Sequence, residues 1–353
     1  MADEHRLSSS LNIVDVEDID SGEAYRKRIK RAKYIISTVL VLSFIVFVVI
    51  AAAAVLNAGI DKIVGTLETI NLWYLLAAFA VIFVSYVFRF PKWEQYMKRL
   101  NVHIPRTKNF LIYMSMYSMD ITPGRWGRAV VSYTINRITG IRFANTFPAV
   151  VADIFTDFLG FAFLAVFMAF FVGRFQVLSV IITAILLIPF VFIYTKRLFK
   201  FFKRKMHRIR LFKSLFKHGE VYFRYNKLLD RGVYAYSMLY TIPSMFINGF
   251  ALYLVILSFG ISLDPAFIPA VLFIYSSSLM LGLITGLPAT MGVTDAALIG
   301  YLVLFFPTLI TFATASLITI FFRIASVWFV EGFGFAALAH TMKYWNVKSA
   351  VER

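Results

Sequence analysis

Residues 146–171 read TFPAVVADIFTDFLGFAFLAVFMAFF, and the only charged residues in this stretch are Asp153 and Asp157. About 20 consecutive apolar residues are enough for an α-helix to cross the hydrocarbon core of a membrane. The stretch is therefore predicted to be a transmembrane helix. The two aspartates are four residues apart, so they share one face of that helix. A carboxylate at this depth is costly unless it is paired or functional. Asp157 is the stronger functional candidate, and a salt bridge to an arginine of the same protein is the alternative.

Further apolar stretches flank this one along the chain. Hydrophobic residues make up 60% of the 353 residues and charged residues only 16%, whereas a soluble domain has about 25% charged residues. The sequence predicts an all-α polytopic transmembrane bundle of about seven or eight spans, with broken or re-entrant half-helices. The predicted spans are residues 34–56, 71–90, 146–171, 177–194, 233–259, 266–286 and 309–340.

The charges indicate how the chain is oriented. Lysines and arginines number 36 against 19 acidic residues, which gives a net charge of +17. They gather before the first span, in the loop 195–232 and at the C-terminus, and basic loops mark the cytoplasmic side. Both termini are therefore predicted to be cytoplasmic, in a multi-pass protein of the cell membrane. The predicted organisation is a tail (1–30), a transmembrane domain (31–345) and a second tail (346–353).

The basic loop 195–232 and the content of cysteine and histidine exclude several classes of function. The loop 195–232 serves as an orientation signal, or forms amphipathic helices that hold anionic lipid on the inner leaflet. No basic domain stands apart from the membrane, which argues against nucleic acid as a partner. The chain has no cysteine, so a disulfide framework and a thiol nucleophile are excluded. Its histidines show no metal-ligand spacing, and we expect no metal and no cofactor.

Two interruptions of the apolar pattern resemble each other. The first is Pro123-Gly-Arg-Trp-Gly127, inside the interrupted stretch 109–134, and the second is Pro288-Ala-Thr-Met-Gly292. In each, a short apolar helix is predicted just after the glycine, and a charged residue follows in a span about 30 residues later: Asp157 in the first case and Arg323 in the second. This repetition predicts an internal repeat with a central site. The alternative is that the prolines only kink helices.

The two breaks are predicted to bind an anion. The N-terminus of a half-helix exposes backbone N–H groups and the positive end of the helix dipole, where phosphate or carboxylate binds readily. Arginines add charged hydrogen bonds. Asp295 is also a candidate helix cap, and Asp120 a turn former. The candidate substrate-binding residues are Pro123, Gly124, Arg125, Gly127, Arg128, Asp153, Asp157, Pro288, Thr290, Gly292, Asp295 and Arg323.

These motifs resemble those of the membrane region of the lysylphosphatidylglycerol synthases and their stand-alone flippase-like relatives. That family has Pro-Gly-x-x-Gly-Glu-x-x-Lys/Arg followed by a transmembrane Asp, and Pro-Gly-Gly-x-Gly-x-x-Glu-Ala followed by a transmembrane Arg. The matching residues are Pro123, Gly124, Gly127 and Asp157, then Pro288, Gly292, Asp295, Ala296 and Arg323. The sequence departs from the pattern at Arg128 (usually Glu), Val131 (usually basic), Ala289 and Thr290 (usually Gly) and Ile154 (often Arg).

The resemblance implies a transporter that moves a polar-headed lipid, either an anionic phospholipid or a polyisoprenoid-linked lipid, between leaflets. It implies no enzymatic activity, a separately encoded glycosyl- or aminoacyl-transferase as partner, and a homodimer. No GxxxxGK[ST] loop is present, so a gradient drives movement or the process is passive. The main alternative is a proton-coupled transporter of a small anionic solute with Asp157 as proton carrier. The chain has no obvious motif of a membrane enzyme, and a protein with only a scaffolding role would not need buried charges.

Overall fold

A computed structural model of the chain describes residues 59–194 and 230–351, together with positions 45, 48, 49, 52, 56 and 228. All of these residues belong to one compact unit, Ser43–Arg353. The predicted tail 1–30, most of the predicted span 34–56 and nearly all of the basic loop 195–232 lie outside the described residues. Within the described ranges, every regular element is a helix, which agrees with the predicted all-α class.

Five described helices are long and apolar enough to cross a membrane. They are α4 (Leu72–Arg99), α7 (Phe143–Ala169), α12 (Arg231–Ser258), the Pro265–Thr285 segment that contains η5 (Pro265–Phe267) and α13 (Ile268–Thr285), and Phe312–Lys343. Two shorter apolar helices are Gln176–Ile185, within α8 (Gln176–Tyr194), and α14 (Val293–Phe305). A multi-pass helical membrane protein is therefore confirmed, and the count of seven or eight spans stays a prediction.

The chain breaks where its prolines and glycines predict. The first interrupted stretch forms α5 (Arg106–Ser115), η2 (Met116–Met119), η3 (Pro123–Ala129) and α6 (Val130–Thr139). With 10 residues each, α5 and α6 are about 15 Å long, half the thickness of the hydrocarbon core. The second interruption contains η6 (Pro288–Thr290) and leads directly into α14.

Several boundaries differ from the sequence-based expectation. A short helix, α3 (Ile60–Glu68), occupies the segment before α4, and α4 itself runs on to Arg99 instead of ending near residue 90. The last apolar stretch is α15 (Phe312–Arg323), a π-helical turn η7 (Ile324–Trp328) and α16 (Phe329–Val351). A π-turn inserts an extra residue into an α-helix, and apolar patterning alone does not reveal it.

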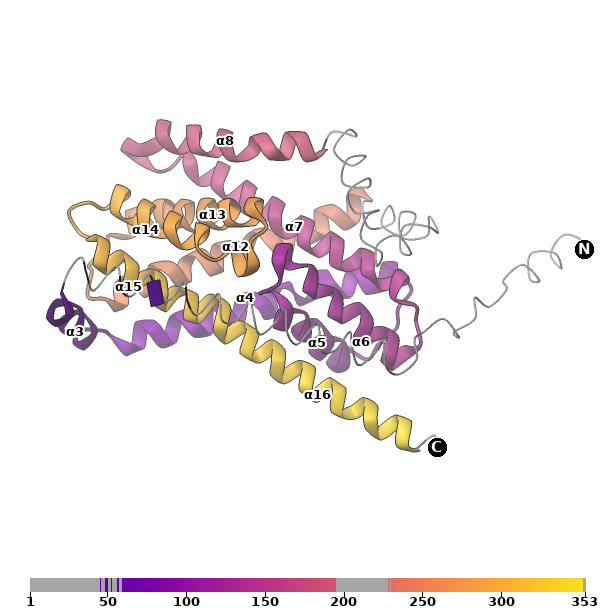
Figure 1. Cartoon of the computed structure of the whole chain (residues 1–353). Coiled ribbons are helices and arrows are strands. Elements are labelled where there is room, and N and C mark those ends of the chain that lie inside the picture. Colours follow the sequence, from indigo (N-terminus) through magenta and orange to yellow (C-terminus); the bar gives the residue numbers. More distant parts are fainter. Residues whose placement is uncertain are drawn as a thin grey trace, which may run out of the picture. The chain divides into compact units, whose positions relative to one another are not determined.

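The helices pack side by side (Figure 1), and the two breaks contact each other. α12 lies along α4, and α7 lies against α13. α16 covers α5 and η2, while η3 contacts η6. Buried polar side chains connect these layers: the Ser85 hydroxyl of α4, for example, lies 2.8 Å from the Asn248 side-chain oxygen of α12. The two irregular segments are partly buried, although Trp126 and Leu287 are exposed, and irregular backbone at membrane depth is stable where it is buried in protein or lines a cavity.

Replacing Gly334 by alanine is expected to destabilise the protein by about 1–3 kcal/mol, because a β-carbon there overlaps the partner backbone. That atom would lie 2.9 Å from the Tyr117 carbonyl carbon and closer still to Ser118. Gly332, in the same helix, has open space around it, so Gly332→Ala should be neutral or stabilising by up to about 1 kcal/mol. Unfolding of the two variants in detergent, followed by tryptophan fluorescence, compares them. Equal stability would show that α16 does not approach η2 this closely.

Candidate functional site

A buried ion cluster surrounds the two aspartates of α7. Lys92 Nζ lies 2.7 Å from an Asp153 oxygen and 3.1 Å from an Asp157 oxygen. Arg128 Nη1 lies 2.7 Å from Asp153 and 3.0 Å from Asp157. Arg89 Nη1 lies 3.3 Å from both Asp157 oxygens. These five side chains are almost completely buried. The opposite charges therefore stabilise each other in a place where water cannot solvate them.

The first break completes this cluster with Asp120 and Arg125. Asp120, at the end of η2, accepts two hydrogen bonds from the Arg128 guanidinium, one of them 2.7 Å long. Arg125 Nη1 lies 3.5 Å from Asp157, and its Nε lies 3.8 Å from Asp120. Four cations thus face three carboxylates in this cluster, which leaves one net positive charge. Asp120 was expected only to form a turn, and its role here is that of an ion-pair partner.

Two members of the cluster were missed by the sequence analysis. Arg89 lies at the end of the predicted span 71–90 and Lys92 just after it, whereas both are buried inside α4. They are three residues apart and therefore share a helical face. The signal that could have revealed them is the apolar and aromatic pattern that continues after them, at Trp93, Tyr96 and Met97. A solvated loop would show polar residues there.

The second break contains the reverse arrangement of charge. Arg323, the last residue of α15, lies with its Nε 2.9 Å from an Asp295 oxygen, and its Nη2 donates to the Ala289 carbonyl at 2.7 Å. Asp295 also accepts a 2.8 Å hydrogen bond from the Gly292 backbone N–H, which caps α14. The arginines that pair with Asp157 belong to the first cluster, whereas Arg323 pairs with Asp295. At the first break, Arg128 is near the break and Asp157 lies in the later helix α7. At the second break, Asp295 is near the break and Arg323 lies in the later helix α15.

The two breaks share an unusual backbone conformation and touch. The two residues after each proline have left-handed dihedrals: Gly124 and Arg125 in the first break (φ 60° and 59°), Ala289 and Thr290 in the second (φ 47° and 57°). Left-handed geometry costs a non-glycine residue about 1–2 kcal/mol. The Ala289 N–H donates to the Ile121 carbonyl at 2.9 Å and joins the breaks. Strain of this kind persists where the surrounding structure enforces it, often at functional sites.

Three of the backbone donors at the breaks already have protein acceptors. The Arg125 N–H donates to the Thr122 carbonyl at 2.9 Å, and the Gly127 N–H donates to the Thr122 hydroxyl at 2.6 Å. In the second break, Asp295 occupies the Gly292 N–H. The guanidinium groups of the breaks are therefore stronger anion-binding candidates than these three N–H groups.

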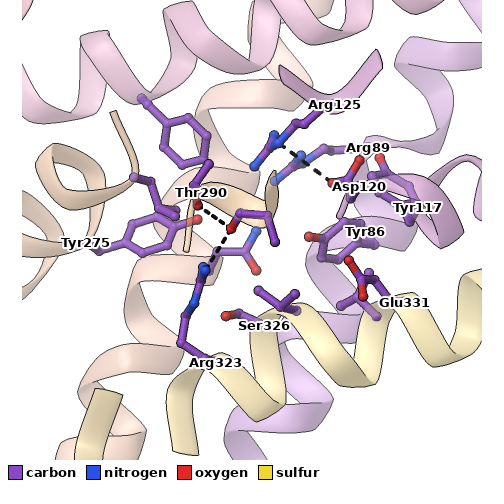
Figure 2. A pocket seen from close by; sticks show the side chains of 16 residues that line it. Tyr86, Arg89, Tyr117, Asp120, Arg125, Tyr275, Thr290, Arg323, Ser326 and Glu331 are labelled. Atoms are coloured by element: carbon purple, nitrogen blue, oxygen red, sulfur yellow. Dashed lines mark hydrogen bonds and ion pairs between the residues drawn. The ribbon is translucent and has the colours of Figure 1, made fainter. Parts of the chain in front are cut away.

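A cavity of about 60 Å³ lies where the breaks meet (Figure 2). Arg125 and Asp120 line it from the first break, Thr290 from the second, and Arg323 and Glu331 from the last helices. Arg89 also reaches it, so three guanidinium groups face two carboxylates. The volume is sufficient for a few water molecules. Arg125 is the least buried of the arginines of the two ion clusters, with a side chain 16% exposed.

The structure brings the predicted residues into two adjacent groups. Arg125, Arg128, Asp153 and Asp157 form the first, and Thr290, Asp295 and Arg323 lie at the second. Gly124 and Gly127 shape the first break and Gly292 the second, with Pro123 and Pro288 at the start of η3 and η6. Among the described residues, no group of three or more His, Cys, Asp or Glu side chains is arranged to hold a metal ion.

Comparison with known proteins identifies the family of the chain. The family model described as "Lysylphosphatidylglycerol synthase TM region" matches residues 35–334, most of the chain. The chain belongs to this family. A relative from Methanothermobacter thermautotrophicus named "UPF0104 membrane protein" is 21% identical over 294 residues, which cover 74% of this chain and 82% of the relative. Both breaks and both ion clusters lie inside the family region.

Proposed function

We propose that the chain moves a lipid with an anionic headgroup, a phospholipid or a polyisoprenoid-linked phosphate, between the leaflets of the cell membrane. The observation that supports this most directly is the cavity between the breaks, with Arg89, Arg125 and Arg323 on its wall at the core of a membrane protein. Guanidinium groups bind phosphate oxygens through paired hydrogen bonds. Membership of the lysylphosphatidylglycerol synthase membrane-region family fits a lipid substrate.

Each part of the site has a separate task in this proposal. Arg125 and Arg323 contact the headgroup from opposite breaks, while Asp153 and Asp157 hold the buried cations in place. The cavity as it stands admits only a few waters, so a headgroup enters when η3 and η6 separate. The proposal includes cytoplasmic termini, a homodimer and a separately encoded transferase that makes or consumes the lipid.

Reconstitution with Arg125→Ala tests the proposal. In vesicles that contain a fluorescent anionic lipid, wild-type protein should let an impermeant reductant bleach the inner-leaflet label, and the variant should slow this several-fold. Arg125→Lys keeps the charge and should retain more of the rate. Alanine leaves the left-handed backbone no more strained than arginine does, so the guanidinium is the main change. If vesicles with verified incorporation of the wild-type protein bleach no faster than protein-free vesicles, the proposal is contradicted.

The alternative of a small anionic solute rests on the same chemistry, because free phosphate and a lipid phosphate present the same oxygens. Uptake of labelled inorganic phosphate into the same vesicles distinguishes the two sources. Asp157 is a poor candidate for the proton carrier of that alternative, since Arg89, Lys92, Arg125 and Arg128 all contact it. A proton bound there would have to disrupt this cluster.

A further inference from the structure

Glu331 is a buried carboxyl group that the ion clusters do not include. It lies in the first turn of α16, is 4% exposed and lines the cavity between the breaks. Its Oε1 has no hydrogen-bond partner among the described residues. The structure shows no ion pair to Glu331 within 59–194 and 230–351. An ionised carboxylate without a counter-ion is strongly disfavoured at membrane depth.

The π-turn η7 explains how this group reaches the cavity. An α-helix advances about 100° per residue, so residues eight apart, such as Arg323 and Glu331, would differ in direction by about 80°. A π-turn takes up one extra residue, which reduces the difference to about 20°. Arg323 and Glu331 therefore both face the cavity, as Figure 2 shows. The turn adds an acid to a wall on which Arg323 is the other charged residue of this segment.

None of the charged groups around Glu331 forms an ion pair with it in the described part of the chain. The titratable side chains that share its cavity are Tyr86 and Arg89 of α4, Tyr117 of η2, Asp120, Arg125 of η3, Tyr275 of α13 and Arg323 of α15. Each arginine in this set already binds another carboxylate: Arg89 and Arg125 bind Asp157, and Arg323 binds Asp295. Asp120 adds a second negative charge to the same space.

We infer that Glu331 is a proton-binding site of the cavity, which carries a proton while the cavity is closed and exchanges it when the cavity opens to water. The coupling to transport rests on the proposed function. A protonated Glu331 does not repel an anionic headgroup and can donate a hydrogen bond to it. Binding of the proton and of the anion then strengthen each other, because coupling between two sites is reciprocal. Each cycle would carry a proton together with the anion.

Infrared spectroscopy of the lipid-free protein tests the proton site without any transported substrate. At neutral pH, wild type should show the carbonyl stretch of a protonated carboxyl group, and Glu331→Gln should lose it completely. Glu331→Asp should keep such a band. The matched control Glu68→Gln changes an exposed glutamate of α3 in the same way and should leave the band unchanged. A wild-type spectrum without this band, or a band that survives in Glu331→Gln, overturns the inference.

The pH dependence of lipid movement then tests the coupling. In the vesicle assay, wild-type translocation should slow several-fold as the pH rises from 6 to 9, about the range in which a buried glutamate titrates, while Glu331→Gln should show a flat profile. The same slope in both proteins overturns the coupling. If the infrared band of the protonated carboxyl group is present but no lipid moves, the proposed function is contradicted and the proton site is retained. Failure of the proposed function and failure of the proton site are therefore distinguishable.

Discussion

Asp157→Asn is expected to lower the free energy of unfolding by about 3–5 kcal/mol, the usual cost of removing one partner from a buried ion pair. The substitution keeps the shape of the side chain but leaves four cations facing only Asp120 and Asp153. Lys92 and Arg128 would retain Asp153, at 2.7 Å each, whereas Arg89 would lose its only carboxylate contact in the described part of the chain. Unfolding in mixed detergent measures the loss.

A second substitution shows whether charge is the cause. Lys92→Met removes a neighbouring cation at similar volume, so the double variant Asp157→Asn with Lys92→Met should recover a large part of the lost stability. Asp264→Asn is the matched control, because Asp264 is exposed and asparagine also caps a helix. It should change stability by no more than about 0.5 kcal/mol. Additive losses in the double variant would show that Lys92 and Asp157 are not coupled.

The sequence was sufficient to predict the long helices and the breaks, because both depend on local properties. Apolar length determines whether a helix such as α7 crosses a membrane. The proline and glycine spacing at residues 123–127 and 288–292 marks the two points where the helices stop. The predicted span 146–171 accordingly agrees with Phe143–Ala169 to within a few residues.

The partners of the buried charges were not predictable in the same way, because they are set by tertiary packing. Arg89 and Lys92 resemble the basic residues that end a span, and only the position of α7 beside α4 shows that they are buried against Asp153 and Asp157. The facing direction of Glu331 depends on the π-turn η7. No periodicity of apolar residues predicts such a turn.

The departures from the family motifs become intelligible once the ion pairs are known. Arg128 stands where a glutamate is usual, and it binds Asp120, Asp153 and Asp157. A carboxylate at that position would face these three acids. Asp153 and Asp157 compensate the charges of Arg89 and Lys92, and Asp120 balances the additional charge of Arg128. Ala289 and Thr290 stand where glycines are usual and have left-handed dihedrals, a conformation that glycine adopts without strain.

Arg323→Gln is expected to reduce lipid translocation about tenfold or more, since a charged hydrogen bond is worth about 1.5–3 kcal/mol and 1.4 kcal/mol corresponds to a factor of ten.

The same change leaves Asp295 buried and without its cation, so a fall in rate alone would not separate function from folding. The double variant Asp295→Asn with Arg323→Gln removes both charges and should regain most of the stability. Its translocation rate should remain low if Arg323 binds the headgroup. Recovery of stability and rate together would mean that Arg323 serves only to hold the second break, and the headgroup site would then have to rest on Arg125 and Arg89.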